Sequence, residues 1–253
     1  MMAGELSGAV ALVTGACGNI GQEIVKALAA RGATVIATDI AAREDIRRLD
    51  VTSEAEWAAL IADIRREHGR LDILVNNAGI APMARLEDMP LEDWRRCQQI
   101  NVESVFLGMK TAAGLMAESG MLRAGGASIV NIASAAADRG TAMSGAYCAS
   151  KAAVAMLTRV GAVEFPTQGY AIRVNSVHPG AVRSDMIDGI LDRYSAMTGG
   201  TPKADLEKAI TANMPMGRLV EPSEVADVVA FLAGTDSRFV HGTSINVDGG
   251  YMA

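Results

Sequence analysis

Three residues near the middle of the chain, Ser134, Tyr147 and Lys151, have types and spacings that suit proton transfer. Tyr147 and Lys151 are four residues apart, so on a helix they lie on one face, one turn apart. An ammonium group beside a phenol favours the phenolate and lowers the pKa of the tyrosine. One charge about 4 Å away, at an effective dielectric of about 20, stabilises the phenolate by about 4 kcal/mol. This is enough to bring the pKa of the phenol from about 10 to about 7. Such a tyrosine can act as a general acid and base, with Ser134 hydrogen-bonding the reacting oxygen.

The segments around these residues are expected to place them together. An apolar strand is predicted at Ser128–Ile132, and Ser134 lies just past its carboxyl end. A loop of small residues then leads into a helix predicted at Gly145–Pro166, which carries Tyr147 and Lys151. Taken singly, a tyrosine–lysine pair is usually an ordinary surface pair, and a serine after a strand is usually a turn residue. Features elsewhere in the chain are needed to distinguish a catalytic set from these ordinary roles.

Apolar runs typical of strands alternate with segments of helical periodicity along the whole chain. Uniformly apolar strands separated by helices are typical of a parallel sheet covered on both faces, so we predict a doubly wound, seven-stranded α/β fold. The predicted strands are Ala9–Thr14, Thr34–Thr38, Ile46–Val51, Ile73–Asn76, Ser128–Ile132, Ile172–Val177 and Ser244–Val247. The predicted helices are Ile20–Arg31, Glu54–His68, Leu91–Glu118, Gly145–Pro166 and Ser223–Gly234.

The chain reads as a single domain over residues 1–253, because no linker, repeat or low-complexity segment divides it. One stretch, Arg183–Leu219, is irregular and is interrupted by glycines and prolines. It is long enough to form a lid or the wall of a pocket.

Bulk composition restricts the class of protein. Half of the residues are hydrophobic and the formal net charge is -6, which argues against a surface for nucleic acid or an anionic membrane. No apolar run reaches the ~18 residues of a membrane helix, and Met1–Gly8 lacks the basic start and apolar core of a signal peptide. Cys17, Cys97 and Cys148 are scattered and odd in number, and no metal-ligand spacing is present. We therefore expect a cytoplasmic protein without a metal, a nucleic-acid partner or a membrane partner.

The turn after the first predicted strand is rich in glycine, with Gly15, Gly18 and Gly21 between the strand and a helix. Glycines let the backbone approach a pyrophosphate, and the helix N-terminus presents free N–H groups to its charge. Asp39 closes the second strand, where a carboxylate can bind a ribose hydroxyl. A glycine-rich turn alone is weak evidence and an aspartate can simply cap a turn, but the two together predict a bound dinucleotide.

With these features the chain resembles the short-chain dehydrogenase/reductase family, from about Leu6 to Gly250. The resemblance implies a Rossmann-type fold and a nicotinamide dinucleotide cofactor. Ser134 and Tyr147 are 13 positions apart, as the pattern of the family expects. The motifs that carry the resemblance are the loop Thr14–Gly21, Asp50-Val51, Asn76-Asn77-Ala78-Gly79, Asn101, Ser134, Tyr147-Cys-Ala-Ser-Lys151 and Pro179-Gly180.

By this resemblance the catalytic residues are Asn101, Ser134, Tyr147 and Lys151. Tyr147 is the acid and base, Lys151 lowers its pKa and holds the ribose, and Ser134 orients the substrate oxygen. Asn101 would hold a water linked to Lys151 and so complete a proton path to solvent. His178 is interpreted as a packing or loop residue, because the tyrosine and lysine already fill the acid and base role.

The resemblance also implies how the cofactor is held. Asp50 and Val51 are expected to flank the adenine, and Val182 is expected to meet the nicotinamide carboxamide. The expected cofactor-binding residues are Gly15, Cys17, Gly18, Asn19, Ile20, Gly21, Asp39, Ile40, Asp50, Val51, Asn77, Ala78, Gly79, Tyr147, Lys151, Pro179, Gly180, Val182 and Ser184.

Three departures from the family pattern affect these expectations. Asn19 replaces a glycine of the loop, and we expect the loop to persist because asparagine tolerates left-handed conformations. Ser184 stands where a threonine is common, and its hydroxyl is still expected to reach the cofactor. The interval from Asp39 to Asp50 is short, so the usual helix there is expected to be only a turn.

The expected cofactor is NAD rather than NADP, because the carboxylate of Asp39 would oppose the extra phosphate on the adenosine ribose. Arg43, four residues on, is the competing feature, since it could turn toward such a phosphate. We expect Asp39 to prevail, because it would remain against the ribose and could pair with the arginine.

The predicted reaction is reversible hydride transfer between NAD(H) and a hydrophobic secondary alcohol, cyclic or steroid-like, or its ketone. The stretches Ile100–Gly108 and Gly169–Pro179 resemble bacterial hydroxysteroid and related secondary-alcohol dehydrogenases. A 3-oxoacyl-[acyl-carrier-protein] reductase and a non-catalytic NAD-binding protein remain as alternatives. The expected substrate-pocket residues are Ser134, Ala136, Met143, Tyr147, Met186, Ile187 and Tyr194.

Self-association is expected from the long helices Leu91–Glu118 and Gly145–Pro166. They carry more apolar and small residues than one face of a sheet needs. By the resemblance they pair across a two-fold axis, which predicts a homotetramer, with a dimer as the alternative.

Overall fold

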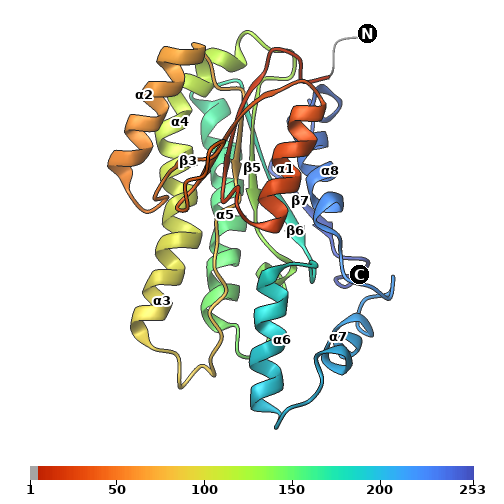
Figure 1. Cartoon of the computed structure of the whole chain (residues 1–253). Coiled ribbons are helices and arrows are strands. Elements are labelled where there is room, and N and C mark those ends of the chain that lie inside the picture. Colours follow the sequence, from red (N-terminus) through yellow and green to blue (C-terminus); the bar gives the residue numbers. More distant parts are fainter. Residues whose placement is uncertain (1–4) are drawn as a thin grey trace.

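The computed structural model describes residues 5–253, and these form a seven-stranded parallel sheet in the order β3-β2-β1-β4-β5-β6-β7 (Figure 1). Residues 1–4, part of the stretch Met1–Gly8 considered above, lie outside the described residues. The predicted doubly wound fold is confirmed. The strands are β1 Val10–Thr14, β2 Thr34–Asp39, β3 Arg47–Arg48, β4 Ile73–Asn76, β5 Ala127–Ile132, β6 Ile172–Pro179 and β7 Ser244–Val247.

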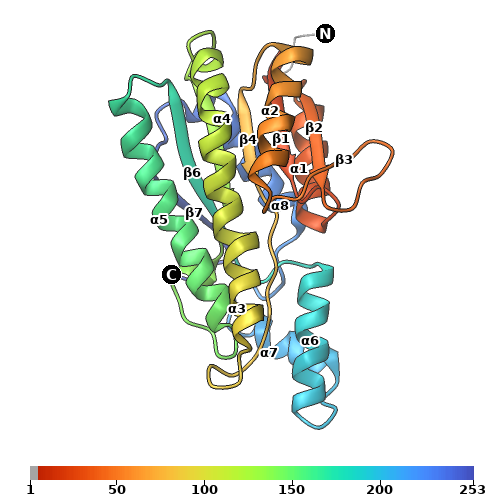
Figure 2. The ribbon, with the colours of Figure 1, turned by 90° about the vertical axis from the view of Figure 1, so that its left-hand side faces the viewer.

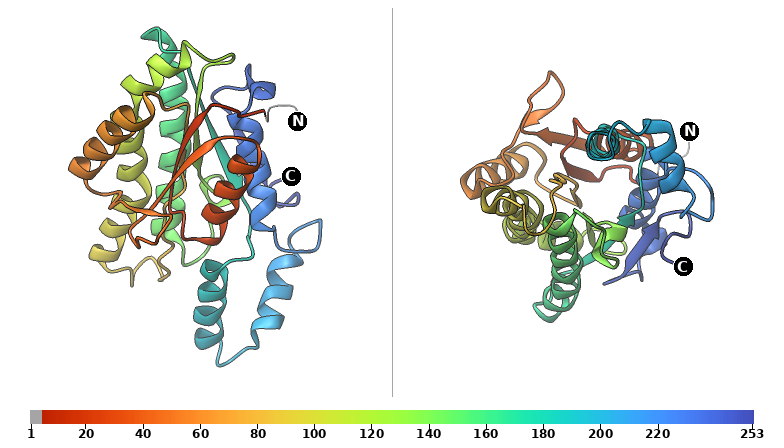
Figure 3. Two further views of the ribbon diagram at one scale, coloured as in Figure 1. Left: turned by 45° about the horizontal axis from the view of Figure 1, so that its top comes forward. Right: turned by 90° about the horizontal axis from the view of Figure 1, so that it is seen from below.

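Helices cover both faces of the sheet (Figures 1 and 3). Side chains alternate across each strand, so Val10 and Leu12 of β1 pack with α2, α4 and α5, while Ala11 and Val13 pack with α1 and α8. The sheet interior is therefore buried from both sides, which explains why its strands are uniformly apolar. The helices are α1 Asn19–Ala30, α2 Glu54–His68, α3 Leu91–Gln98, α4 Ser104–Gly120, α5 Gly145–Thr167, α6 Asp185–Met197, α7 Lys203–Thr211 and α8 Pro222–Ala233.

Local sequence signals set the ends of several helices. Helix α2 begins after Ser53, whose hydroxyl accepts a hydrogen bond from the backbone N–H of Glu56, and it ends at Gly69 with a φ of 68°. This left-handed conformation is one that glycine adopts without strain. Helix α8 begins with a capping box between Glu221 and Glu224.

Three elements differ from the prediction. The third strand is reduced to Arg47–Arg48. The reason is that the short interval after β2 forms a turn, which is closed by a bridge between Arg43 and Ile46. The predicted helix Leu91–Glu118 is three segments, since a π-helical turn, η1 Gln99–Glu103, separates α3 from α4. The irregular stretch Arg183–Leu219 contains α6 and α7, which project beyond the carboxyl edge of the sheet (Figure 2).

The order of the strands fixes where a ligand can bind. Strand β1 pairs with β2 on one side and with β4 on the other, so the connections run in opposite directions from this point. In open α/β sheets the crevice at such a switch point, outside the carboxyl ends of the strands, is the usual ligand site. None of the helices within residues 5–253 is long and apolar enough to cross a bilayer.

Candidate active site

A cavity of about 1010 Å³ lies at the carboxyl ends of the strands, beneath the helices α6 and α7. This volume is at the upper end of the ~300–1,000 Å³ typical of ligand pockets, so it can hold a large ligand. Most of the site residues expected from the sequence line it. They are Gly15, Gly18, Asn19, Ile20, Gly21, Asp39, Ile40, Asp50, Val51, Asn77, Ala78, Gly79, Ser134, Ala136, Tyr147, Lys151, Pro179, Gly180, Val182, Ser184, Met186, Ile187 and Tyr194.

Three expected residues, Cys17, Asn101 and Met143, do not line the cavity. The Cys17 thiol turns away and donates to the carbonyl of Ala41, 3.2 Å distant. Asn101 is fully buried behind the cavity wall. Met143 sits in a strained turn with a φ of 65°, where its carbonyl accepts a hydrogen bond from the backbone N–H of Ala84. The loop backbone, rather than any loss of apolar character, removes Met143 from the pocket.

The glycine-rich turn packs tightly against the loop after β4. A side chain at Gly15 would lie 2.8 Å from the Cα atom of Ala78, and Gly15 has a φ of 65°, so only glycine fits. The side-chain amide of Asn77 donates to the carbonyls of Thr14 and Gly15 at 2.9 and 3.0 Å. No side chain caps helix α1 after Gly18, and its first turn holds no acidic residue. Its N-terminal N–H groups therefore suit an anion such as a phosphate.

Asp39 closes β2 at one end of the cavity. Its carboxylate accepts hydrogen bonds from the backbone N–H groups of Cys17 at 3.0 Å and Ala41 at 3.1 Å. A carboxylate has about four acceptor positions, so Asp39 retains capacity for ribose hydroxyls. Asp50 lies on the same wall, where the Thr52 hydroxyl and backbone N–H hold the pKa of its carboxyl below the usual range.

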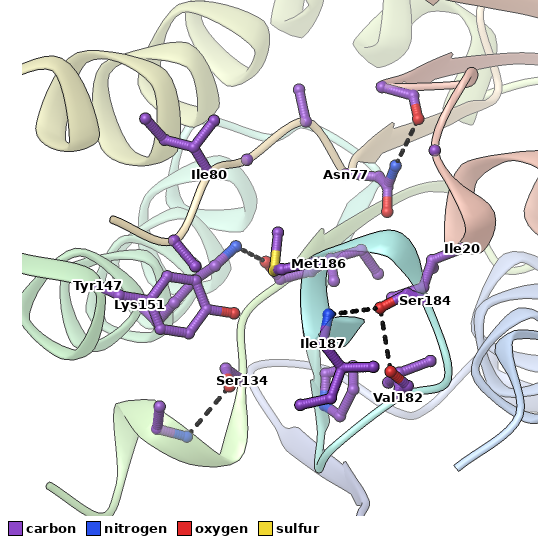
Figure 4. Close-up of a pocket in the computed structure, with 18 of the residues that line it drawn as sticks. Ile20, Asn77, Ile80, Ser134, Tyr147, Lys151, Val182, Ser184, Met186 and Ile187 are labelled. Atoms are coloured by element: carbon purple, nitrogen blue, oxygen red, sulfur yellow. Dashed lines mark hydrogen bonds between the residues drawn. The ribbon is translucent and has the colours of Figure 1, made fainter. Parts of the chain in front are cut away.

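Tyr147 and Lys151 share one face of α5, as the sequence predicts. The ammonium nitrogen of Lys151 lies 5.7 Å from the centroid of the Tyr147 ring and donates a 2.7 Å hydrogen bond to the carbonyl of Ile132. Figure 4 shows the Tyr147 hydroxyl directed into the cavity, on the side where Ser134 lies. The three side chains thus line one cavity, although Ser134 comes from the loop after β5 and the other two come from α5.

The pKa of Tyr147 is shifted in the direction opposite to the expectation from the sequence. Burial raises the pKa of the Tyr147 phenol, and the hydrogen bond with Ser134 offsets only part of that rise. Burial also lowers the pKa of Lys151 to about 8. The reason is that the surrounding protein disfavours the charged form of each group, while the ammonium is held by the main-chain carbonyl of Ile132 rather than by the phenol.

Asn101 stands in the π-helical turn η1. Its amide donates to the carbonyl of Ile80 and the hydroxyl of Ser150, both at 2.9 Å, and its carbonyl oxygen accepts from the backbone N–H of Ile80. A Cβ atom built on Gly79 would lie 3.3 Å from the Asn101 oxygen and 3.4 Å from the Lys151 ammonium. Asn101 therefore fixes the loop after β4 against α5, close to Lys151.

The segment Arg183–Leu219 begins shortly after β6. The Ser184 hydroxyl caps α6 by accepting from the backbone N–H of Ile187 at 3.4 Å, and it donates to the carbonyl of Val182 at 3.0 Å (Figure 4). Asn19 is the first residue of α1 and does not adopt a left-handed conformation. The tolerance of asparagine for that conformation is therefore not what preserves the loop.

The cavity has further lining residues that the sequence did not reveal. Arg96, Gln99 and Ile100 could have been found, because spacings of three and four place them on one helical face. Tyr251, near the C-terminus, gives no signal of this kind. The further lining residues are Ile80, Ala81, Met83, Thr141, Ser144, Ile210, Asn213 and Met214.

The chemistry of the site fits a dinucleotide. It combines an uncapped helix N-terminus at a glycine turn, a carboxylate at the end of β2, and a tyrosine–lysine pair in which the lysine is buried. Within residues 5–253 no group of three or more His, Cys, Asp or Glu side chains is arranged to hold a metal ion. Fold and site together define the class of dinucleotide-binding oxidoreductases.

Comparison with known proteins agrees with that class. A family model described as enoyl-(acyl carrier protein) reductase matches residues 15–252. The 3-beta-hydroxysteroid dehydrogenase of Comamonas testosteroni is 36% identical, over 98% of this chain and 97% of that protein. The cis-4-hydroxycyclohexanecarboxylate dehydrogenase of Sinomonas cyclohexanicum is 39% identical, over 96% of each chain. The cyclopentanol dehydrogenase of a Comamonas strain is 37% identical over 99% of each.

A solved structure agrees as well. The ligand-free aldohexose dehydrogenase of Thermoplasma acidophilum superposes with a TM-score of 0.87 at 32% identity, covering 98% of this chain and 96% of that one. The chain belongs to the short-chain dehydrogenase/reductase family. Members of that family are oxidoreductases that use nicotinamide cofactors.

Proposed function

We propose that this protein is an NAD(H)-dependent dehydrogenase that interconverts a hydrophobic, cyclic or steroid-like secondary alcohol and its ketone. The observation that carries the proposal is the meeting of Ser134, Tyr147 and Lys151 in a cavity that also holds the glycine-rich turn and Asp39. The family supports the reaction type, and the geometry supports the roles of the individual residues.

The protein contributes proton transfer and positioning. A bound nicotinamide supplies the hydride acceptor in oxidation and the hydride donor in reduction. Tyr147 takes the hydroxyl proton of the alcohol in one direction and returns it to the ketone oxygen in the other. Ser134 holds that oxygen by a hydrogen bond. Lys151 binds the ribose, and Asn101, packed beside Gly79 close to Lys151, supports the proton path to solvent.

NAD is the proposed cofactor rather than NADP. Asp39 lines the adenosine end of the cavity, where its charge opposes an additional ribose phosphate. Arg43, the competing residue, belongs to the turn bridged to Ile46 and is not part of the cavity lining. A phosphate in the cavity would therefore meet the carboxylate before it met the guanidinium.

An apolar alcohol is the proposed substrate because the walls around Tyr147 are largely apolar. Met186 and Ile187 of the lid line this cavity together with Ile80 and Met83 of the loop after β4. Flexible methionines adapt to differently shaped apolar ligands. The relatives named above are dehydrogenases of a hydroxysteroid, a hydroxycyclohexane acid and cyclopentanol, which supports a ring-bearing alcohol.

Self-association into a homotetramer is proposed from exposed apolar side chains. Phe106 of α4 and Met156, Val160 and Val163 of α5 are between 41% and 66% exposed, on helices that lie side by side (Figure 2). Phe239, before β7, is fully exposed. Patches at two places suit two different contacts in a tetramer. A mass near 26.4 kDa by light scattering at micromolar concentration would exclude this assembly.

The cytoplasm is the proposed location, and the support is that Cys17, Cys97 and Cys148 are all free thiols. We propose one catalytic domain over residues 1–253, with the lid at 183–219 acting as a wall of the substrate pocket.

The decisive experiment is a screen of cyclopentanol, cyclohexanol and hydroxysteroids with NAD, followed by absorbance at 340 nm, in wild type and in Tyr147→Phe. We expect turnover of at least one ring-bearing alcohol and a loss of more than 10-fold in the variant, with NADH binding nearly unchanged. The 3-oxoacyl-[acyl-carrier-protein] alternative is tested with acetoacetyl thioesters and NADPH. Activity confined to thioesters or charged sugars would overturn the proposed substrate class.

A further inference from the structure

A buried histidine stands outside the catalytic set and contacts the loop that carries Ser134. His178 lies in β6 and is fully buried, with its Nδ1 atom 2.7 Å from the Asp138 carboxylate and its Nε2 atom 2.9 Å from the Ser176 hydroxyl. The Ser176 hydroxyl is in turn 3.3 Å from that of Ser244 in β7. A buried polar group fully satisfied on both sides is a fixed structural point.

The chemistry of the partners assigns the protons in this network. An ionised carboxylate only accepts, so the Nδ1–H of His178 donates to Asp138. The Nε2 atom of the neutral ring then accepts from Ser176, whose oxygen accepts from Ser244. Burial lowers the pKa of His178, and Arg159 and Lys151 act in the same direction against the attraction of Asp138. The direction of this shift favours the neutral ring that the two hydrogen bonds require.

Asp138 closes the turn that Ser134 opens. The Ser134 hydroxyl caps the 3-10 turn η2 Ala135–Ala137 by accepting from the backbone N–H of Ala136 at 3.1 Å. The three alanines of this turn have no polar side chains with which to anchor it. A backbone hydrogen bond from the N–H of Ala133 to the carbonyl of Val177 holds the start of the turn to β6, and the link from Asp138 to His178 holds its end. Beyond His178, β6 runs directly into Pro179 and Gly180, which line the cavity.

We infer that His178 is a positioning residue, which through Asp138 fixes the turn of Ser134 against β6 and so aligns the Ser134 hydroxyl with Tyr147. The inference rests on the proposed function for what Ser134 does, but the contact itself does not depend on the substrate. Small displacements of a positioning group reduce turnover strongly, since the reacting atoms must be aligned.

Asp138 is the better place to test this contact, because its side chain is 39% exposed and its replacement should leave the core folded. Asp138→Ala removes the acceptor, whereas Asp138→Asn keeps an oxygen that can accept from the neutral ring. We expect kcat to fall about 10- to 50-fold in Asp138→Ala and less than about 3-fold in Asp138→Asn, with the Kd for NADH within about 2-fold of wild type in both. Asp236→Ala, at an exposed aspartate elsewhere, is the matched control.

A double-mutant cycle shows whether the effect passes through Ser134. In a Ser134→Ala background, Asp138→Ala should cause no further loss beyond about 2-fold, because the hydroxyl it positions is gone. Losses that multiply, or a fall in NADH affinity that matches the fall in kcat, would overturn the inference. An Asp138→Asn variant as inactive as Asp138→Ala would also overturn it.

Hydrogen exchange gives a readout that does not require activity. Amides of residues 134–139 should exchange faster in Asp138→Ala than in wild type, and Asp138→Asn should restore protection. Unchanged exchange in Asp138→Ala would refute the contact as an anchor. If exchange responds as expected but no alcohol is turned over by the wild type, the proposed function fails while the anchor stands.

Discussion

The side-chain oxygen of Asn19 accepts a 3.1 Å hydrogen bond from the backbone N–H of Asp185, 166 positions away in the chain. Asn19 opens α1 at the glycine-rich turn, and Asp185 opens α6, the first helix of the lid. The residue that departs from the glycine of the family pattern therefore joins the turn to the lid. This bond couples the position of the lid to the part of the site proposed to hold the cofactor phosphates.

Removal of this bond should loosen the lid. A single neutral hydrogen bond contributes about 0.5–1.5 kcal/mol, so Asn19→Ala should weaken NADH binding about 2- to 10-fold and speed proteolysis within residues 183–219. Asn19→Asp keeps the acceptor and should preserve resistance to proteolysis, but its charge beside the phosphates should weaken NADH binding further. Fluorescence titration with NADH and timed digestion measure the two effects. Unchanged affinity and digestion in Asn19→Ala would show that the bond does not hold the lid.

The raised pKa of Tyr147 predicts opposite pH dependences for the two directions of the reaction. At pH 7 the phenol is protonated, which suits ketone reduction but leaves little base for alcohol oxidation. We therefore expect kcat/KM for oxidation to increase as pH rises from 7 to 9, and kcat/KM for reduction to stay level before falling at higher pH. Initial rates in both directions between pH 6 and 10 test this. An oxidation rate that declines from pH 7 to 9 would contradict the assignment.

The buried charge of Lys151 should lower the stability of the folded protein, although the residue supports activity. Its ammonium is buried with no carboxylate partner within the described residues, and its pKa falls from 10.5 to about 8 on folding. The folded state thus binds the proton less tightly, so stability is lost as pH falls from about 10.5 to about 8. Lys151→Met should therefore raise the free energy of unfolding by about 1–3 kcal/mol at pH 7, after the lost bond to Ile132 is discounted.

This gain should shrink as pH approaches 10.5, where the lysine is neutral in both states. Denaturant unfolding at pH 7 and pH 10 measures it, and Lys110→Met, at an exposed lysine of α4, serves as the control. The Lys151 variant should also lose most turnover and bind NADH more weakly. A Lys151→Met protein that is less stable than wild type at pH 7 would show that the bond to Ile132 outweighs the buried charge.

The sheet could be predicted because its strands are buried on both faces and therefore read as uniform apolar runs. Helix α2 was predicted with its observed bounds, since Ser53 and Gly69 supply a capping residue and a left-handed terminus. The break at η1 Gln99–Glu103 could not be predicted, because a single π-helical turn inside a helix affects too few residues to be seen in the apolar pattern. The two-residue β3 has polar side chains and gives almost no signal.

Within the site, the residues on ends of strands and on helix α5 could be predicted, whereas contacts across the chain could not. Ser134, Tyr147 and Lys151 follow from local spacing on elements that the sheet order brings together. The bond from Asn19 to Asp185 depends on how the lid folds back, which local periodicity does not encode. Met143 was expected in the pocket for its apolar character, but a backbone with φ 65° turns that part of the loop away.

The choice between NAD and NADP should depend on Asp39, whose carboxylate is fixed at the cavity by the backbone N–H groups of Cys17 and Ala41. Repulsion between two anions about 4 Å apart is about 4 kcal/mol at an effective dielectric of about 20, and solvent screening reduces it to about 1.5–3 kcal/mol. We expect kcat/KM to favour NAD by about 10- to 150-fold in wild type and the ratio to fall at least about 10-fold in Asp39→Ala. Arg43→Ala should leave the ratio within about 2-fold, because Arg43 lies outside the cavity lining.

Thermal unfolding of Asp39→Ala must accompany the kinetics, since two backbone donors lose their acceptor and stability should fall by about 1–3 kcal/mol. A wild-type preference for NADP, or an unchanged ratio in a folded Asp39→Ala protein, would remove Asp39 from this role.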